Sequence, residues 1–302
     1  MADKKNEIAE EMPEESLEEL FAKLDQVAKE LESGDTSLEE SFGLYQKGME
    51  MLKLCNEKID TVEKKCRCWK RMEKYMTFKE EMKERTEVIE KLLVKYLPKA
   101  EGYQSQIMEA MEYSVMAGGK RLRPMLMQET YRLFGGEGKE IEPFMAAMEM
   151  IHTYSLVHDD LPAMDNDEYR RGRKTTHIVY GEAMGILAGD ALLNYAFETA
   201  VKAFEIAPEK SLLIGKALKI LAEKAGIYGM IGGQVVDVAS CGVGLDEGML
   251  NFIYELKTGA LIESSMMIGA LLAGAEDAEL EKCRRSHRMW GLLSRSRMTS
   301  WM

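Results

Sequence analysis

Apolar residues recur at helical spacing through most of this chain, and this periodicity constrains the fold more than any other feature. Between Ser16 and Glu32 they fall at positions i, i+3, i+4 and i+7, and a second stripe runs from Leu38 to Val62. Residues 145–161, 185–197 and 212–225 predict further helices, and no alternating strand pattern of useful length occurs. The sequence therefore predicts an all-α protein.

The first two stripes predict a helical hairpin over roughly residues 15–65. Gly34 suits the C-terminal cap of the first helix, and Ser37-Leu38-Glu39-Glu40 forms a capping box that opens the second. The hairpin carries no nucleophile, metal cluster or phosphate-binding loop. Because so small a unit buries little apolar surface, we expect a partner chain to cover its apolar face.

Three carboxylates, those of Asp159, Asp160 and Asp165, lie within a stretch of seven residues. They cannot share a dry pocket as anions unless a cation joins them, and Mg²⁺ prefers a few carboxylates together with water and phosphate oxygens. Arg170 and Arg171 follow closely, and a guanidinium pairs with phosphate in a bidentate manner. The pattern favours a Mg²⁺–diphosphate site, and the alternative is a solvated surface turn.

The spacing of these acids requires a distorted helix. Residues six apart do not share a helical face, so Asp159 and Asp165 cooperate only if the helix breaks between them. Pro162 supplies that break, because it lacks a backbone donor and clashes with the preceding turn.

Upstream of the acids, Gly118-Gly119-Lys120-Arg121-Leu122-Arg123-Pro124 joins a flexible glycine pair to three cations. Lys120 and Arg123 can hold phosphate oxygens, although such a turn is often only a solvated loop. The predicted helix 145–161 carries His152 and Tyr154, and a lone histidine there is more often a core residue than a ligand. The 24 methionines are interpreted as core filler.

Composition narrows the function classes. A net charge of −12 argues against a dedicated binder of nucleic acid or anionic membranes. The most apolar run, Gly259 to Ala275, contains Glu263 and is too short to span a bilayer. Five scattered cysteines give no disulfide framework. We expect a cytoplasmic protein without a membrane segment.

The hairpin is similar to the small subunit of exodeoxyribonuclease VII. The resemblance rests on residues 31–41, Leu-Glu-Ser-Gly-Asp-Thr-Ser-Leu-Glu-Glu-Ser, with Tyr45, Gly48 and Cys55 following. It implies a non-catalytic hairpin that assembles on the large subunit of a nuclease acting on single-stranded DNA. A generic acidic coiled-coil hairpin is the alternative.

Six motifs in order resemble the trans-prenyl diphosphate synthases: GGKRLRP, HDDLPAMD, RRGR, GDALL, GGQVVD and KTGAL. The bacterial farnesyl diphosphate synthases are the most similar group, and the resemblance covers residues 83–282. It implies an isoprenoid-synthase helical bundle around a central cavity, Mg²⁺ as cofactor, isopentenyl and allylic diphosphates as substrates, and a homodimer. A terpene cyclase is a weaker rival, because cyclases do not need the GGKRLRP clamp.

The resemblance also implies residue roles. Asp159 and Asp165, supported by Asp160, correspond to the Mg²⁺ ligands that grip the allylic diphosphate. The isopentenyl diphosphate clamp corresponds to Lys120, Arg123, His152 and Arg171, and the allylic diphosphate contacts to Arg170, Lys257 and Thr258. Tyr154, five positions before the acidic motif, corresponds to the floor of the product pocket, while Gln234 and Asp237 match a motif of local support.

Residues 66–82 fit neither neighbour, because a basic linker with Trp69 and two cysteines is unusual. Back-translated and read one base earlier, the stretch can encode an acidic tail and a stop. We interpret it as a frameshifted linker that fuses an upstream hairpin, residues 1–65, to the synthase-like domain, residues 83–282.

The end of the chain departs from the synthase family, which has a second acidic motif, FQxxDDxxD. Residues 283–302 lack it, and five arginines lie between Arg284 and Arg297. Read one base earlier, residues 291–302 can encode Gly-Leu-Ala-Phe-Gln-Ile-Gln-Asp-Asp-Ile-Leu-Asp, so we interpret the tail as frameshifted and the bundle as incomplete. We expect little or no prenyltransferase activity from the chain as written. The rival interpretation is a nuclease small subunit with the synthase part as a passenger, and resequencing codons 60–82 and 280–302 tests the frameshifts.

Overall fold

A computed structural model describes residues 17–32, 40, 42–55, 77–240 and 246–285 of the chain. The chain folds into two compact units, Met1–Thr77 and Phe78–Met302.

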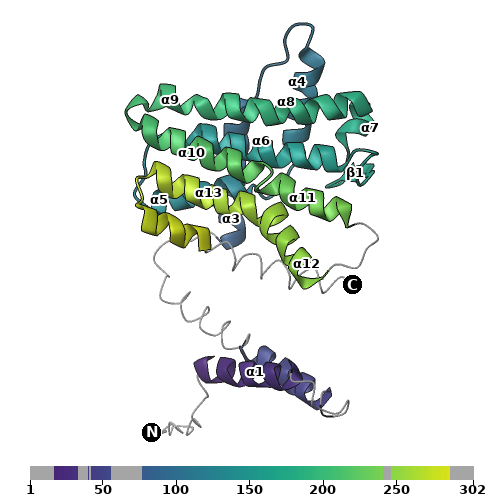
Figure 1. Cartoon of the computed structure of the whole chain (residues 1–302), viewed down its shortest axis with the longest axis vertical. Coiled ribbons are helices and arrows are strands. Elements are labelled where there is room, and N and C mark those ends of the chain that lie inside the picture. Colours follow the sequence, from purple (N-terminus) through teal and green to yellow (C-terminus); the bar gives the residue numbers. More distant parts are fainter. Residues whose placement is uncertain (1–16, 33–39, 41, 56–76, 241–245, 286–302) are drawn as a thin grey trace, which may run out of the picture. The chain divides into compact units, whose positions relative to one another are not determined.

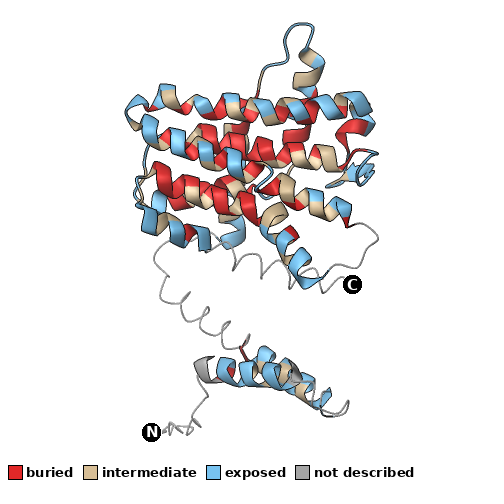
Figure 2. Ribbon diagram, viewed as in Figure 1, coloured by how far each residue is buried: buried red, intermediate tan, exposed pale blue. Residues whose placement is uncertain are grey.

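The first unit contains helix α1, Leu17–Glu32, and a second helical stretch over residues 42–55. Both agree with the predicted stripes, whereas Ser37 and Leu38 of the predicted capping box and the break at Gly34 lie outside the described residues. Leu20 and Cys55 are buried, but Phe42, Tyr45 and Met49 are exposed. The described part of the second apolar stripe, from Phe42 to Leu52, is therefore exposed to solvent (Figure 2).

The second unit is a helical bundle, and the all-α prediction is confirmed. Its principal helices are α3 (Phe78–Tyr96), α4 (Ser105–Val115), α5 (Leu122–Leu133), α6 (Ile141–Asp159), α8 (Glu182–Val201), α10 (Ser211–Ala225), α11 (Met230–Ala239) and α13 (Ala260–Leu272). Shorter helices are α7 (Thr176–Tyr180), α9 (Ala203–Ile206) and α12 (Glu247–Ile253), with a 3-10 turn at Pro208–Lys210, a π-helix at Tyr254–Gly259 and a final helical stretch at residues 277–285. The helix α3 begins five residues before position 83, where the sequence interpretation placed the domain start.

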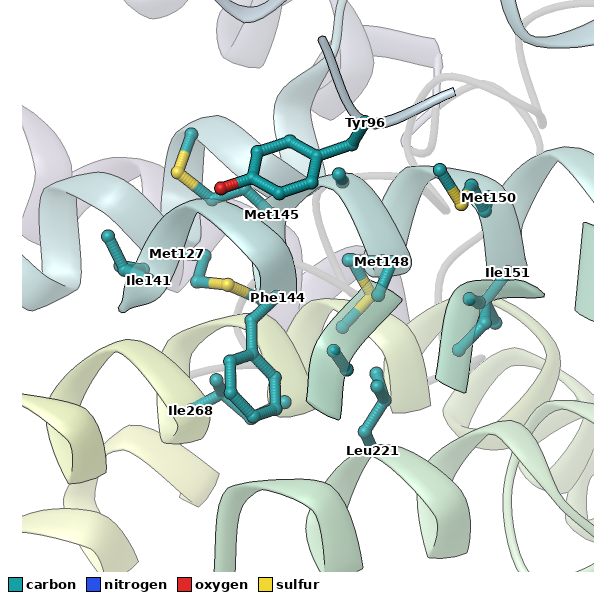
Figure 3. Packing of buried hydrophobic residues seen from close by; sticks show 14 of the residues in the cluster. Tyr96, Met127, Ile141, Phe144, Met145, Met148, Met150, Ile151, Leu221 and Ile268 are labelled. Carbon is teal, nitrogen blue, oxygen red and sulfur yellow. The ribbon is translucent and has the colours of Figure 1, made fainter. Parts of the chain in front are cut away.

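Helix α6 forms the centre of the bundle, because it is apolar on nearly every face and 13 of its residues are buried. It packs against α8 and α5, while α13 packs against α5 and α10 (Figures 1 and 2). Phe144, Met145, Met148 and Met150 lie in one cluster with Leu221 of α10 (Figure 3). The interpretation of methionine as core filler is confirmed for these three, each at most 1% exposed.

The described residues contain one short β-hairpin in addition to the helices. Strands β1 (Tyr169–Arg170) and β2 (Arg173–Lys174) pair antiparallel, with Arg170 opposite Arg173. The two-residue turn between them has positive φ at both Arg171 and Gly172, as a tight hairpin requires. No described helix is long and apolar enough to cross a membrane.

Candidate active site

A cavity of about 900 Å³ opens at the C-terminal end of α6. Its wall is mostly apolar and includes Leu161, Met164, Leu193, Val235 and Val238. Its polar lining comes from four elements and includes Arg123 of α5, His152 and Asp159 of α6, Gln234 of α11, and Lys257 and Thr258 of the π-helix. An apolar chamber with charged groups on its wall can hold a molecule that has a charged head and a hydrocarbon tail.

The predicted break after Asp159 is present. Helix α6 ends at Asp159, and a turn through Pro162 brings the backbone N–H of Asp165 to the carbonyl oxygen of Asp159 at 2.8 Å. The Nε2 of Gln234 donates to Oδ1 of Asp159 at 2.8 Å, so α11 orients that carboxylate. Burial raises the pKa of Asp159, and the charges of Asp165 and Asp160 add to the rise, while Lys257 and Arg170 oppose it.

Asp160 is turned toward a different partner. Its Oδ1 accepts from Nε of Arg170 at 2.6 Å, and the carboxylate lines a separate small cavity of about 30 Å³ together with Arg170 and Arg171. Burial raises the pKa of Asp160, although the hydrogen bond from Arg170 opposes this. The second carboxylate of the motif therefore orients the guanidinium of Arg170.

Asp159 and Asp165 are the two carboxylates of this segment that could hold Mg²⁺, and the charge of Asp165 acts on Asp159. Among the described residues no group of three or more carboxylate, histidine or cysteine side chains is close enough to hold a metal by itself. Mg²⁺ is commonly held by one or two carboxylates plus substrate phosphates and water. A cation beside Asp159 would also relieve the unfavourable burial of its charge, which the raised pKa reports.

The GGKRLRP segment supplies the cationic side of the site. Lys120 is exposed, whereas Arg123 lines the cavity and its Nε is buried without a hydrogen-bond partner among the described residues. Arg171 donates to the carbonyl oxygen of Gly118, so the hairpin turn touches this segment directly. Burial lowers the pKa of His152 well below its usual value, and the charges of Arg123 and Arg171 lower it further. Burial and the neighbouring guanidinium groups therefore favour the neutral form of the His152 imidazole.

The opposite side of the cavity is built where α11 meets the π-helix. The Nζ of Lys257 donates to Oδ2 of Asp237 at 2.5 Å, which fixes the ammonium group. Gly233 permits the close approach of α11 to the π-helix, because a Cβ at this position would stand 2.3 Å from the backbone nitrogen of Lys257. The π-helix adds one residue to a turn, as is common at functional sites.

Tyr154 lies one turn before His158 and faces the same cavity. Its ring makes an edge-to-face contact with His158, with centroids 5.9 Å apart. The hydroxyl is buried and finds no hydrogen-bond partner in the described part of the chain, and burial raises the pKa of Tyr154 to about 12. The ring therefore presents a bulky wall to the cavity.

Comparison with known proteins agrees with this geometry. The sequence profile of the family described as Polyprenyl synthetase matches residues 104–293. The chain belongs to this family. A second profile, Exonuclease VII small subunit, matches residues 18–67. The resemblance of each part is confirmed.

Individual relatives extend the comparison. The large subunit 1 of the heterodimeric geranylgeranyl pyrophosphate synthase of Arabidopsis thaliana is 45% identical over 69% of this chain, and the farnesyl diphosphate synthase of Geobacillus stearothermophilus is 44% identical over 65%. The matched part spans 57% of the first relative and 65% of the second. The crystal structure of an FPP/GFPP synthase from Zymomonas mobilis superposes with a TM-score of 0.67 at 35% identity, covering 71% of this chain and 77% of that one.

The structure separates the predicted site residues into three groups. Six line the large cavity: Arg123, His152, Tyr154, Asp159, Lys257 and Thr258. Of the others, Asp160, Arg170 and Arg171 line the small cavity, while Lys120 and Asp165 are exposed at the segments that flank the site. Sequence reasoning missed the buried Arg121–Glu149 ion pair, whose signal is a glutamate within the apolar run of α6.

Proposed function

We propose that the second unit binds isopentenyl diphosphate and an allylic diphosphate and condenses them to geranyl and then farnesyl diphosphate. The observation that carries the proposal is the apolar cavity of about 900 Å³ with Asp159, Lys257 and Arg123 on its wall. The cationic side chains can bind a diphosphate, and the apolar volume can hold a prenyl chain. Both halves of the substrate are accommodated in one site.

The two diphosphates bind to different sets of residues in this mechanism. Lys257 and Thr258 of the large cavity hold the allylic diphosphate together with Arg170, which Asp160 orients. Asp159 and Asp165 would hold Mg²⁺, which neutralises diphosphate charge and so favours departure of the leaving group. Lys120, Arg123, Arg171 and neutral His152 hold isopentenyl diphosphate, whose double bond attacks the allylic carbon.

The apolar wall protects the reaction, because a carbocation formed beside Leu161 and Val235 meets few water molecules. Diphosphate released at the cationic wall then accepts the proton lost from the condensed product. Tyr154 closes the cavity and sets the product length. Replacing Tyr154 by Ala opens the floor, so we expect products longer than farnesyl diphosphate, measured by chromatography after dephosphorylation. An unchanged product distribution would contradict this role.

Incubating the full chain with Mg²⁺, isopentenyl diphosphate and dimethylallyl diphosphate tests the proposal. Farnesyl product from this incubation would support the function and contradict the expected loss of turnover. Binding of both diphosphates by calorimetry without product would support the site and the expected loss together. Absence of both binding and product would refute the function. Lys257→Gln is the matched variant, because it removes one cation and should weaken allylic diphosphate binding selectively.

The first unit supports a second proposal. Its match to the nuclease small-subunit profile and the exposed Phe42, Tyr45 and Met49 favour an interface with an exodeoxyribonuclease VII large subunit. Co-purification of that subunit with the wild-type chain tests the proposal, and binding should be lost in the double variant Phe42→Ser with Tyr45→Ser.

We also propose that the chain forms a homodimer through the second unit, which sedimentation tests. From its sequence we further propose a cytoplasmic location.

A further inference from the structure

Arg121 and Glu149 form a buried ion pair between the start of α5 and the middle of α6. The NH1 of Arg121 donates to Oε1 of Glu149 at 2.7 Å, and the two side chains are 1% and 3% exposed. The NH2 of the same guanidinium donates to the carbonyl oxygen of Val115 at 2.7 Å and to Glu90 at 3.3 Å. Arg121 therefore ties the end of α4 and the core helix α6 to the GGKRLRP segment.

The backbone of Arg121 has an unusual conformation. Its φ and ψ are 48° and 36°, in the left-handed region that residues other than glycine avoid. Such a conformation persists only where surrounding contacts determine it, and the three hydrogen bonds of the guanidinium do so here. The turn directs Lys120 to solvent and begins α5, on which Arg123 reaches the cavity.

Glu149 links its ion pair with Arg121 to other residues of the proposed site. It lies one helical turn before His152 on α6, the helix that ends at Asp159. Its negative charge also favours the charged forms of Arg123 and Arg171, opposing the burial that lowers the pKa of each. One buried carboxylate thus contacts Arg121 and acts on the two arginines that face the proposed isopentenyl diphosphate.

We propose that Arg121 and Glu149 are positioning residues for the isopentenyl diphosphate half of the site, and this inference rests on the proposed function. The pair fixes the GGKRLRP segment against α6, so that Lys120 and Arg123 stand at the correct distance from His152. The allylic half, built from Arg170, Lys257 and Thr258, has separate supports in Asp160 and Asp237. Loss of the pair should therefore affect one diphosphate and spare the other.

Glu149→Gln distinguishes positioning from a simple charge effect, because the two predict opposite signs. If Glu149 acted only as a countercharge, its removal would leave the site more positive and tighten diphosphate binding. If it positions the segment, removal weakens isopentenyl diphosphate binding. We expect the Kd for isopentenyl diphosphate, measured by calorimetry without metal, to rise by about tenfold, the effect of losing one charge-assisted contact.

Two further measurements complete the test on the full chain. The Kd for geranyl diphosphate with Mg²⁺ should stay within about twofold, a factor below one ordinary hydrogen bond. The control is Glu263→Gln, which removes another buried carboxylate, paired with Lys224 at 2.7 Å, and should leave both Kd values unchanged. An unchanged or lower Kd for isopentenyl diphosphate in Glu149→Gln, or equal weakening of both ligands, would overturn the proposal.

Glu149→Gln leaves the guanidinium of Arg121 buried without its carboxylate and can prevent folding. In that case the double variant Arg121→Gln with Glu149→Gln removes both charges together, and the same selective loss is expected. If the wild-type chain binds neither diphosphate, the proposed function fails, and hydrogen exchange of the ligand-free protein decides the positioning role. Faster exchange at residues 116–123 in Glu149→Gln but not in Glu263→Gln supports it, and equal exchange refutes it.

Discussion

Gly269 lies at a close approach between two core helices, and replacing it by Ala should destabilise the second unit. A Cβ at this position of α13 would stand 2.3 Å from the carbonyl oxygen of Met127 and 3.0 Å from the backbone nitrogen of Tyr131, both on α5. Because these atoms are backbone, no side chain can rotate away, and the helices must separate. Overpacking of this kind costs about 1–3 kcal/mol.

The helix propensity of Ala opposes that cost by about 1 kcal/mol. Backbone contact places the steric cost near the upper end of its range, so we expect a net loss of about 2 kcal/mol in the free energy of unfolding. For a unit of this size the midpoint of thermal unfolding should fall by about 4–8 °C.

Gly215→Ala is the matched control, because Gly215 is an exposed glycine of α10 with open space around its Cβ position. It gains the propensity without the clash, so its midpoint should rise by about 2 °C. Calorimetry or urea unfolding of the two variants beside wild type measures the difference. Equal stability of the two alanine variants would refute the argument from close packing.

Two further predictions concern the site. Gly233→Ala places a Cβ against the backbone of Lys257, so we expect weaker geranyl diphosphate binding by about tenfold, by calorimetry, with a smaller effect on isopentenyl diphosphate. Asp159→Asn should stabilise the fold at pH 7, because burial raises the pKa of Asp159 and its ionisation then opposes folding. That advantage should shrink as the pH falls and vanish below the ordinary aspartate value of 3.8, where both states are protonated. Unfolding midpoints of wild type and Asp159→Asn across pH 3–8 measure this advantage. A stability difference that does not depend on pH would contradict the argument. In the same assay Mg²⁺ should stabilise wild type more than the variant.

Local pattern was sufficient to predict most helices. The apolar spacing after Leu212 indicated α10, because burial of one face leaves a period of 3.6 residues in the sequence, whereas the long apolar run from Met145 indicated α6 as a buried helix. Pro162 likewise predicted where α6 ends, since its ring prevents a further helical turn. The hairpin at Arg170–Arg173 was not predicted, because two residues a strand are too few to show alternation.

The sequence by itself determined the all-α fold, the two parts of the chain and the inventory of carboxylates and cations around residue 159. Only the tertiary structure decided how those groups are paired: Asp160 with Arg170, Gln234 with Asp159, Asp237 with Lys257, and Glu149 with Arg121. The physical reason is distance along the chain. Helical periodicity and turn chemistry act over a few residues, whereas these pairs join residues from 10 to 75 positions apart and exist only once the helices have packed.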